Sequence, residues 1–88
     1  MPFVTLRAPL KDLAGGNAEL QLEGDTVGQV LRRLEGDWPK TVGWVLDDQG
    51  RVRSHVNVFV NGERVREDAP VTSQDHLHVL PSISGGAT

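Results

Sequence analysis

Hydrophobic and polar positions alternate in two segments near the start of the chain, residues 3–8 and residues 18–24. The apolar positions are Val4, Leu6 and Ala8 in the first segment and Ala18, Leu20 and Leu22 in the second. Alternation of this kind is typical of a strand with one buried face. The intervening Gly15-Gly16-Asn17 favours a chain reversal, since these residues tolerate positive φ. The pattern therefore predicts two strands paired as a hairpin.

The period becomes helical in residues 25–36. Its apolar positions are Val27, Val30, Leu31 and Leu34, which fall on one side of a helix. Thr26 is the predicted N-cap, and Gln29 stands three residues later, as a capping box requires. Gly36 is predicted to stop the helix in a left-handed conformation. Gly28 weakens the first turn, which predicts a close approach of the helix to the sheet.

The pattern is weakest in residues 37–50. Val42, Val45 and Leu46 have the spacing of one short helical turn. Trp38 and Trp44 are interpreted as packing beside the core, the alternative being a cage for a cationic ligand. Residues 48–50, Asp-Gln-Gly, predict a turn.

The last third of the chain has the clearest strands. In residues 56–66 alternation surrounds Asn61-Gly62, the strongest short signal for a type I′ hairpin. Residues 67–75 are predicted as loop and residues 76–80 as the last strand. Leu77 and Val79 are predicted to point inward, and His76, His78 and Leu80 outward.

These elements predict one α+β domain over residues 1–81. The order strand, strand, helix and three strands suits a mixed sheet of about five strands with one main helix on one face. A β-grasp is the simplest such arrangement, and it places the first and last strands side by side in the middle. Residues 82–88 are predicted to form a flexible tail because they are small and polar.

Composition excludes several kinds of function. The 88 residues contain no cysteine, so we expect no disulfide, thiol nucleophile or cysteine-bound zinc. The net charge is −3 and no basic patch is evident, which argues against nucleic acid as a partner. No apolar run is long enough to cross a membrane and no signal peptide is apparent, which favours the cytoplasm. No catalytic triad, phosphate loop or carboxylate pair is discernible in the sequence, so we do not expect the protein to be an enzyme.

The outward side chains of the predicted strands indicate a partner-binding face. It consists of Phe59, His78 and Leu80, with Pro81 at the strand end. Exposed apolar groups that lie together on a small domain commonly mark an interaction site. In the alternative arrangement, a loop carrying Trp38 or Trp44 covers Phe59.

Two further groups could modify this face. Arg7 and Arg53 are candidates for charged residues at its rim. His76 and His78 project to the same side and could bind a metal together with His55, but ordinary exposed histidines are the favoured interpretation. We therefore expect no metal site.

The ordered segments resemble a known family. "GDTVGQVLRRLE", "VNVFVNGERVR" and "DHLHVLPSISGG" are similar to the helix, central hairpin and last strand with Gly-Gly tail of the ThiS/MoaD ubiquitin-like sulfur carriers. "PLKDLAGG" and "LDDQGRVRSHVNVFVNGERVR" resemble the longer, cysteine-synthase-associated (CysO-type) members. The resemblance spans nearly the whole chain and implies a ubiquitin-like β-grasp fold.

The resemblance implies that the Gly85-Gly86 motif is the working end of the protein. In the family, the carboxylate at the position of Gly86 is adenylated by an E1-like adenylyltransferase that uses ATP and Mg²⁺. It is then converted to a thiocarboxylate, which gives sulfur to a sulfur-accepting synthase. Cysteine, molybdopterin, thiazole, thiolated tRNA and other thio-metabolites are the implied products. The carrier itself has no catalytic residue and binds no cofactor.

Ala87 and Thr88 depart from the usual Gly-Gly end. While they are present, the Gly86 carbonyl is an amide and cannot be adenylated. The resemblance implies that a JAMM-type zinc metalloprotease removes them; the alternative is an incidental extension.

Two other functions remain open. A protein modifier would attach Gly86 to lysines of other proteins, and a non-covalent β-grasp module would not use Gly86 at all. A free arm and one exposed face favour a monomer that meets its partners transiently.

Overall fold

The computed structural model describes the backbone of residues 1–81 and the side chains of residues 1–80. The elements are β1 (Phe3–Leu6), α1 (Leu10–Leu13), β2 (Glu19–Gln21), α2 (Val27–Asp37), the 3₁₀-helix η1 (Pro39–Thr41), β3 (Val56–Val60), β4 (Glu63–Val65) and β5 (His76–Pro81). The predicted order of five strands and one main helix is confirmed, and α1 and η1 are additions to it. No helix within residues 1–81 has the length and apolar character needed to cross a membrane.

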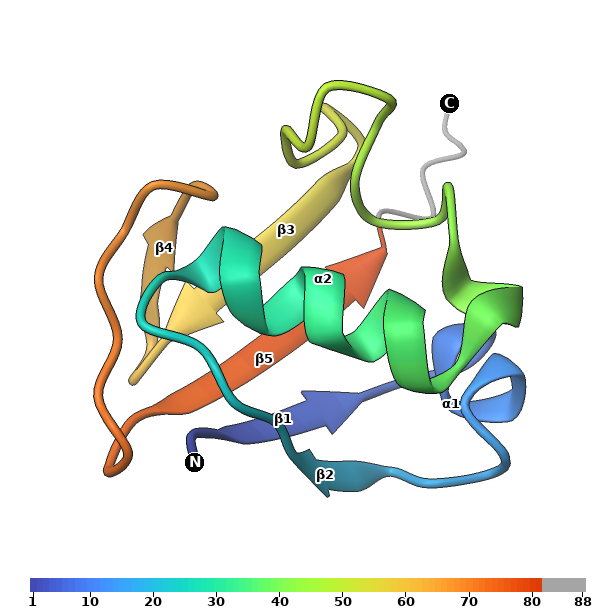
Figure 1. Ribbon diagram of the computed structural model, residues 1–88, viewed down its shortest axis with the longest axis horizontal. Coiled ribbons are helices and arrows are strands. Elements are labelled where there is room, and N and C mark those ends of the chain that lie inside the picture. The colour runs from blue at the N-terminus through green and yellow to red at the C-terminus, as the bar shows by residue number, and fades with distance from the viewer. Residues whose placement is uncertain (82–88) are drawn as a thin grey trace.

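The five strands form one mixed sheet in the order β2-β1-β5-β3-β4. β1 and β5 are parallel neighbours in the middle, while the β1–β2, β3–β5 and β3–β4 pairs are antiparallel. α2 lies across one face of this sheet (Figure 1). The β-grasp arrangement predicted from the order of the elements is therefore confirmed.

The core lies between α2 and the sheet. The alternating residues of β1, β3 and β5 and the apolar stripe of α2 are buried there, as predicted. They include Val4, Leu6, Val58, Leu77 and Val79 from the strands and Val27, Val30, Leu31 and Leu34 from the helix. Each such side chain contributes about 1.5–3 kcal/mol by leaving water.

The predicted start of α2 is confirmed, but its predicted end is wrong. The Thr26 Oγ1 accepts a hydrogen bond from the Gln29 backbone N at 3.2 Å. Gly36 does not stop the helix: α2 continues to Asp37, and the Trp38 backbone N donates to the Leu34 carbonyl at 2.8 Å. The helix ends two residues before Pro39, because Trp38 directly precedes proline and such a residue is disfavoured in helical conformation.

The close approach at Gly28 involves a loop instead of the sheet. The Gly28 backbone N donates to the carbonyl oxygen of Glu67, which follows β4, at 2.8 Å. A Cβ at position 28 would lie 3.1 Å from that oxygen. The glycine thus allows the first turn of α2 to sit against the β4–β5 connection.

The connection from β1 to β2 is longer than a tight hairpin. β1 ends at Leu6 and Ala8 is exposed, so the predicted strand was too long at this end. α1 follows and buries Leu10 against the core. Gly15 and Gly16 then reverse the chain with φ of 70° and 82°, as predicted.

The segment after α2 was predicted only in part. The helical turn predicted at Val42, Val45 and Leu46 is wrong: the 3₁₀ turn η1 starts at Pro39 and ends before Val42, which is 59% exposed. Leu46 instead forms an isolated bridge with Val52. Proline suits the first position of a turn because its φ is fixed near the helical value. Trp38 packs against the core as predicted, whereas Trp44 is 44% exposed.

Candidate functional site

β5 leads the chain out of the sheet at Pro81, which pairs with Val56 at the start of β3. Gly85, Gly86, Ala87 and Thr88, the predicted reactive and processed residues, lie outside the described residues. What the structure describes is the surface from which this segment departs. The start of β3 and the loop before it lie beside the end of β5 (Figure 1).

The predicted apolar face is assembled by the register of β3 and β5. Phe59 pairs directly with His78, and Leu80 lies two residues further along β5 on the same side. These three side chains and Gly62 line a hollow of about 260 Å³. We call it the sheet hollow; its role in binding a partner stays a prediction.

The two tryptophans do not line the sheet hollow. Trp38 instead lines a separate hollow with residues of α1 and with Gly15. The alternative in which a tryptophan-bearing loop covers Phe59 therefore finds no support. The Pro81 side chain is outside the described part of the chain, so its predicted place on this face is untested.

His76 has a neighbour that the sequence did not indicate. Its ring stacks on Phe3 of β1, with ring centroids 4.8 Å apart and planes 14° from parallel. The parallel register of β1 and β5 creates the pair, since it places Phe3 beside His76. Within residues 1–81, no group of three or more His, Cys, Asp or Glu side chains is placed to hold a metal ion.

The β3–β4 turn is tied to the start of β5 by side chains. Asn61 has φ 52° and Gly62 has φ 88°, which fits the predicted type I′ turn. The Asp75 carboxylate accepts from the Thr72 backbone N and from the Asn61 Nδ2, each at 2.8 Å. These hydrogen bonds lower the pKa of Asp75 below its ordinary value, the Thr72 bond most. The network fixes the strands that carry Phe59 and His78.

The two arginines predicted at the rim lie in different places. Arg7 is exposed just after β1. Arg53 is half-buried before β3 and lines a hollow of about 240 Å³ with Arg64 and Arg66.

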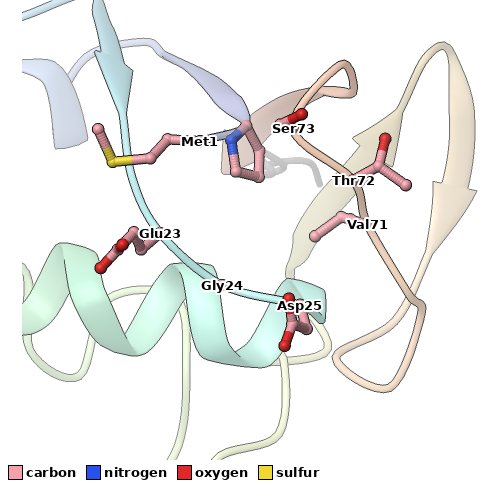
Figure 2. Close-up of a pocket in the computed structure, with 8 residues that line it drawn as sticks. Met1, Glu23, Gly24, Asp25, Val71, Thr72 and Ser73 are labelled. Atoms are coloured by element: carbon pink, nitrogen blue, oxygen red, sulfur yellow. The ribbon is translucent and has the colours of Figure 1, made fainter.

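A larger hollow lies at the other end of the sheet. Met1 and Pro2, Glu23 to Asp25, and Val71 to Ser73 surround about 370 Å³. Figure 2 shows the acidic Glu23 and Asp25 on the β2–α2 connection, across the hollow from residues 71–73 of the β4–β5 connection. This hollow adjoins the beginning of β1, whereas the tail departs from the end of β5.

Comparisons with known proteins place this chain in a family. The ThiS family model matches residues 4–86. The small archaeal modifier protein 1 of Haloferax volcanii is 35% identical, with 92% of this chain and 95% of the relative aligned. The sulfur carrier protein CysO of Mycobacterium tuberculosis is 30% identical over 94% of this chain and 98% of the relative.

Solved structures agree with the fold. The crystal structure of Mycobacterium tuberculosis CysO superposes with a TM-score of 0.85 at 25% identity, covering 94% of this chain and all (100%) of that one. The mixed five-stranded sheet and single main helix are thus those of a ubiquitin-like β-grasp.

Proposed function

The chain belongs to the ThiS family, and from this membership we propose that it is a sulfur carrier whose reactive group is the carboxylate of Gly86. The observation that supports the proposal most is the extent of the family match. It includes Gly85 and Gly86 and ends before Ala87. The relatives bear the names of small carrier or modifier proteins, not of catalysts, and we propose the same co-substrate role here.

The chemistry requires activation because a carboxylate is a poor acylating group. A Gly86 carboxylate oxygen would attack the α-phosphorus of ATP in an E1-like adenylyltransferase and release pyrophosphate. A sulfide equivalent supplied by the partner would then attack the carbonyl carbon, and AMP would leave. ATP and Mg²⁺ belong to the partner's site. Glycine suits this position because it has no Cβ and lets other groups approach the backbone closely.

The proposal requires that the Gly86–Ala87 bond be hydrolysed first. A free carboxylate exists at Gly86 only after that cleavage, for which we propose a JAMM-type metalloprotease. The released segment would carry its new amino group on Ala87.

The sheet hollow is the proposed docking site for the activating and sulfur-accepting enzymes. Phe59, His78 and Leu80 supply an apolar surface beside the strand that ends in the tail. A partner that covers this hollow would hold β5 in a fixed place while the tail enters its active site. Burial of aromatic and aliphatic anchors of this kind commonly dominates binding energy.

The test is the intact mass of the protein purified from its own cells. We expect a species that ends at Gly86 with one oxygen replaced by sulfur. The matched control is a Gly86→Ala chain, which should carry no sulfur. A chain found only at full length while the partner enzymes are expressed would refute the carrier proposal.

A second candidate function is that of a protein modifier, since the 35% identical relative bears that name. Carrier and modifier share the adenylated Gly86 and differ in its fate. A modifier would form isopeptide bonds to lysines of other proteins. Peptides in which a lysine carries a branched remnant ending in Gly85-Gly86, which is residues 67–86 after tryptic cleavage at Arg66, would favour it.

A further inference from the structure

Three arginines converge on a hollow at the end of the sheet from which the tail departs. Arg53 and Ser54 come from the loop before β3, and Arg64 and Arg66 from β4 and the residue just after it. Val52, Val56 and Val65 complete the walls of this hollow of about 240 Å³. We call it the arginine hollow.

One arginine donor in this hollow has no acceptor. The Arg53 Nε is buried and forms no hydrogen bond within the described residues. A buried donor of a charged group without an acceptor is costly, so such donors are normally paired. Within the described residues, no hydrogen bond at Nε therefore ties the Arg53 guanidinium to another group.

The carboxylates of the surrounding loops each accept backbone hydrogen bonds with one oxygen, and Asp47 also attracts Arg53 without forming an ion pair with it. Glu67 Oε1 accepts from the Val52 backbone N at 2.8 Å and pairs loosely with Arg66 at 3.8 Å. Asp47 Oδ1 accepts from the backbone N of Gln49 and of Arg51. Within residues 1–81, neither Arg53 nor Arg64 forms an ion pair. Two guanidinium groups therefore remain available in a chain whose net charge is −3.

The position of the arginine hollow relates it to the proposed reaction. Val56, on its wall, pairs with Pro81, the last described residue before the tail. Arg64 pairs across the sheet with Phe59, which lines the sheet hollow. The apolar and basic surfaces therefore adjoin, and both adjoin the departure point of the tail.

From this arrangement we infer that the arginine hollow binds carboxylate side chains of the enzyme that takes up the tail. The inference rests on the proposed function for the identity of the partner. Arginine is suited to carboxylates because its planar fork donates two parallel hydrogen bonds. The apolar contact at Phe59 and the ionic contact at Arg53 and Arg64 would together fix the direction in which the tail enters.

The experiment is an NMR titration of the isotope-labelled full chain with a capped hexaglutamate peptide at low ionic strength. We expect saturable shifts of the Arg53 Nε–Hε signal and of the Ser54 and Val65 amides. A capped hexaglutamine peptide should produce none of them. Arg64→Gln, an exposed position, should weaken binding about two- to fivefold, as the loss of one exposed ion pair does. Arg53→Gln should do the same where its spectrum shows a folded chain.

Arg33→Gln is the matched control, since Arg33 is an exposed arginine of α2 paired with Asp37. It should leave the peptide affinity unchanged. The inference is overturned if the Arg53 Nε signal does not move, if Arg64→Gln binds as the parent does, or if inorganic phosphate produces the same saturable shifts. These outcomes do not depend on Gly86, so they are distinguishable from a failure to find the thiocarboxylate.

Discussion

The ring of Trp38 leaves no room for a side chain at residue 15. Gly15 has φ 70°, and a Cβ built there would lie 2.7 Å from the ring atom Cζ3. Gly16 has φ 82° but open space around its Cβ position. Gly16 is therefore needed for its backbone conformation alone, whereas Gly15 is needed for both its conformation and its packing against Trp38.

We expect Gly15→Ala to lower the free energy of unfolding by about 1–3 kcal/mol, because it combines left-handed strain with a clash. Gly16→Ala is the matched control and should cost only the conformational part. Urea denaturation measures both. Equal losses in the two variants would mean that Trp38 moves away without cost.

Glu67 should make stability depend on acid pH. Its carboxylate accepts from the Val52 backbone N, which lowers the pKa of Glu67 in the folded chain below its ordinary value of 4.5. The unfolded chain keeps the ordinary value and therefore takes up the proton first as the pH falls. The stabilisation is complete above about pH 4.5 and is lost as the pH drops through the lower, folded-state value.

Urea denaturation between pH 3 and pH 7 tests this expectation. Glu67→Gln should flatten the acid limb of stability against pH. Glu63→Gln, an exposed site on β4, is the control for the loss of one negative charge. An acid limb unchanged in Glu67→Gln would contradict the assignment.

At the scale of elements, the end of α2 shows what a local signal misses. Glycine is the residue type that commonly ends a helix in the left-handed conformation, but Gly36 lies within α2, one residue before its last residue. The stop is set by Pro39 acting on Trp38, and the Arg33–Asp37 ion pair at 3.4 Å spans the last turn. Pro39, and not Gly36, therefore determines where α2 ends.

Gly36→Ala should therefore stabilise the chain by about 0.5–1 kcal/mol, the difference in helix propensity between the two residues. A Cβ at this position meets nothing within 4 Å. Thermal denaturation measures the change. Destabilisation would show that residue 36 needs glycine's conformational freedom after all.

Strong periodic patterns made the main elements predictable from sequence. Alternation predicted β3 and β5, and a capped apolar stripe predicted α2. α1 and η1 are too short for a period to be visible, and their positions depend on burial of Leu10 and on Pro39. Alternation predicted that Phe59 and His78 point to the same face, whereas their direct pairing depends on the register of β3 and β5. The stack of His76 on Phe3 did not, because it requires the parallel register of two strands far apart in sequence.

At the scale of the whole molecule, the sheet separates the core from the proposed docking surfaces. α2 and the core occupy one face, so substitutions on the other face leave most buried contacts intact (Figure 1). The outer face carries the sheet hollow, and the arginine hollow adjoins it. Residues of β3, β4 and β5 line the two hollows, and β5 leads to the tail. A partner can therefore be selected on this side without changing the core.

This separation predicts the effect of shortening Phe59. With a chain ending at Gly86, Phe59→Ala should lower kcat/KM for adenylation by the organism's E1-like enzyme about tenfold or more, as loss of a central aromatic anchor does. The readout is pyrophosphate release. Val42→Ala is the matched control, since Val42 is a 59% exposed apolar residue that does not line the sheet hollow. It should react like the parent.

The spectrum and melting temperature of Phe59→Ala decide how the result is interpreted. Phe59 is only half-buried, so the variant should remain folded, with its core resonances unchanged. A folded Phe59→Ala chain that is adenylated at the parental rate would exclude the sheet hollow as the docking site of the activating enzyme. If a folded Phe59→Ala chain reacts more slowly while Val42→Ala reacts like the parent, the activating enzyme recognises β3 and β5. Gly85 and Gly86 would then be needed only for entry of the tail into its active site.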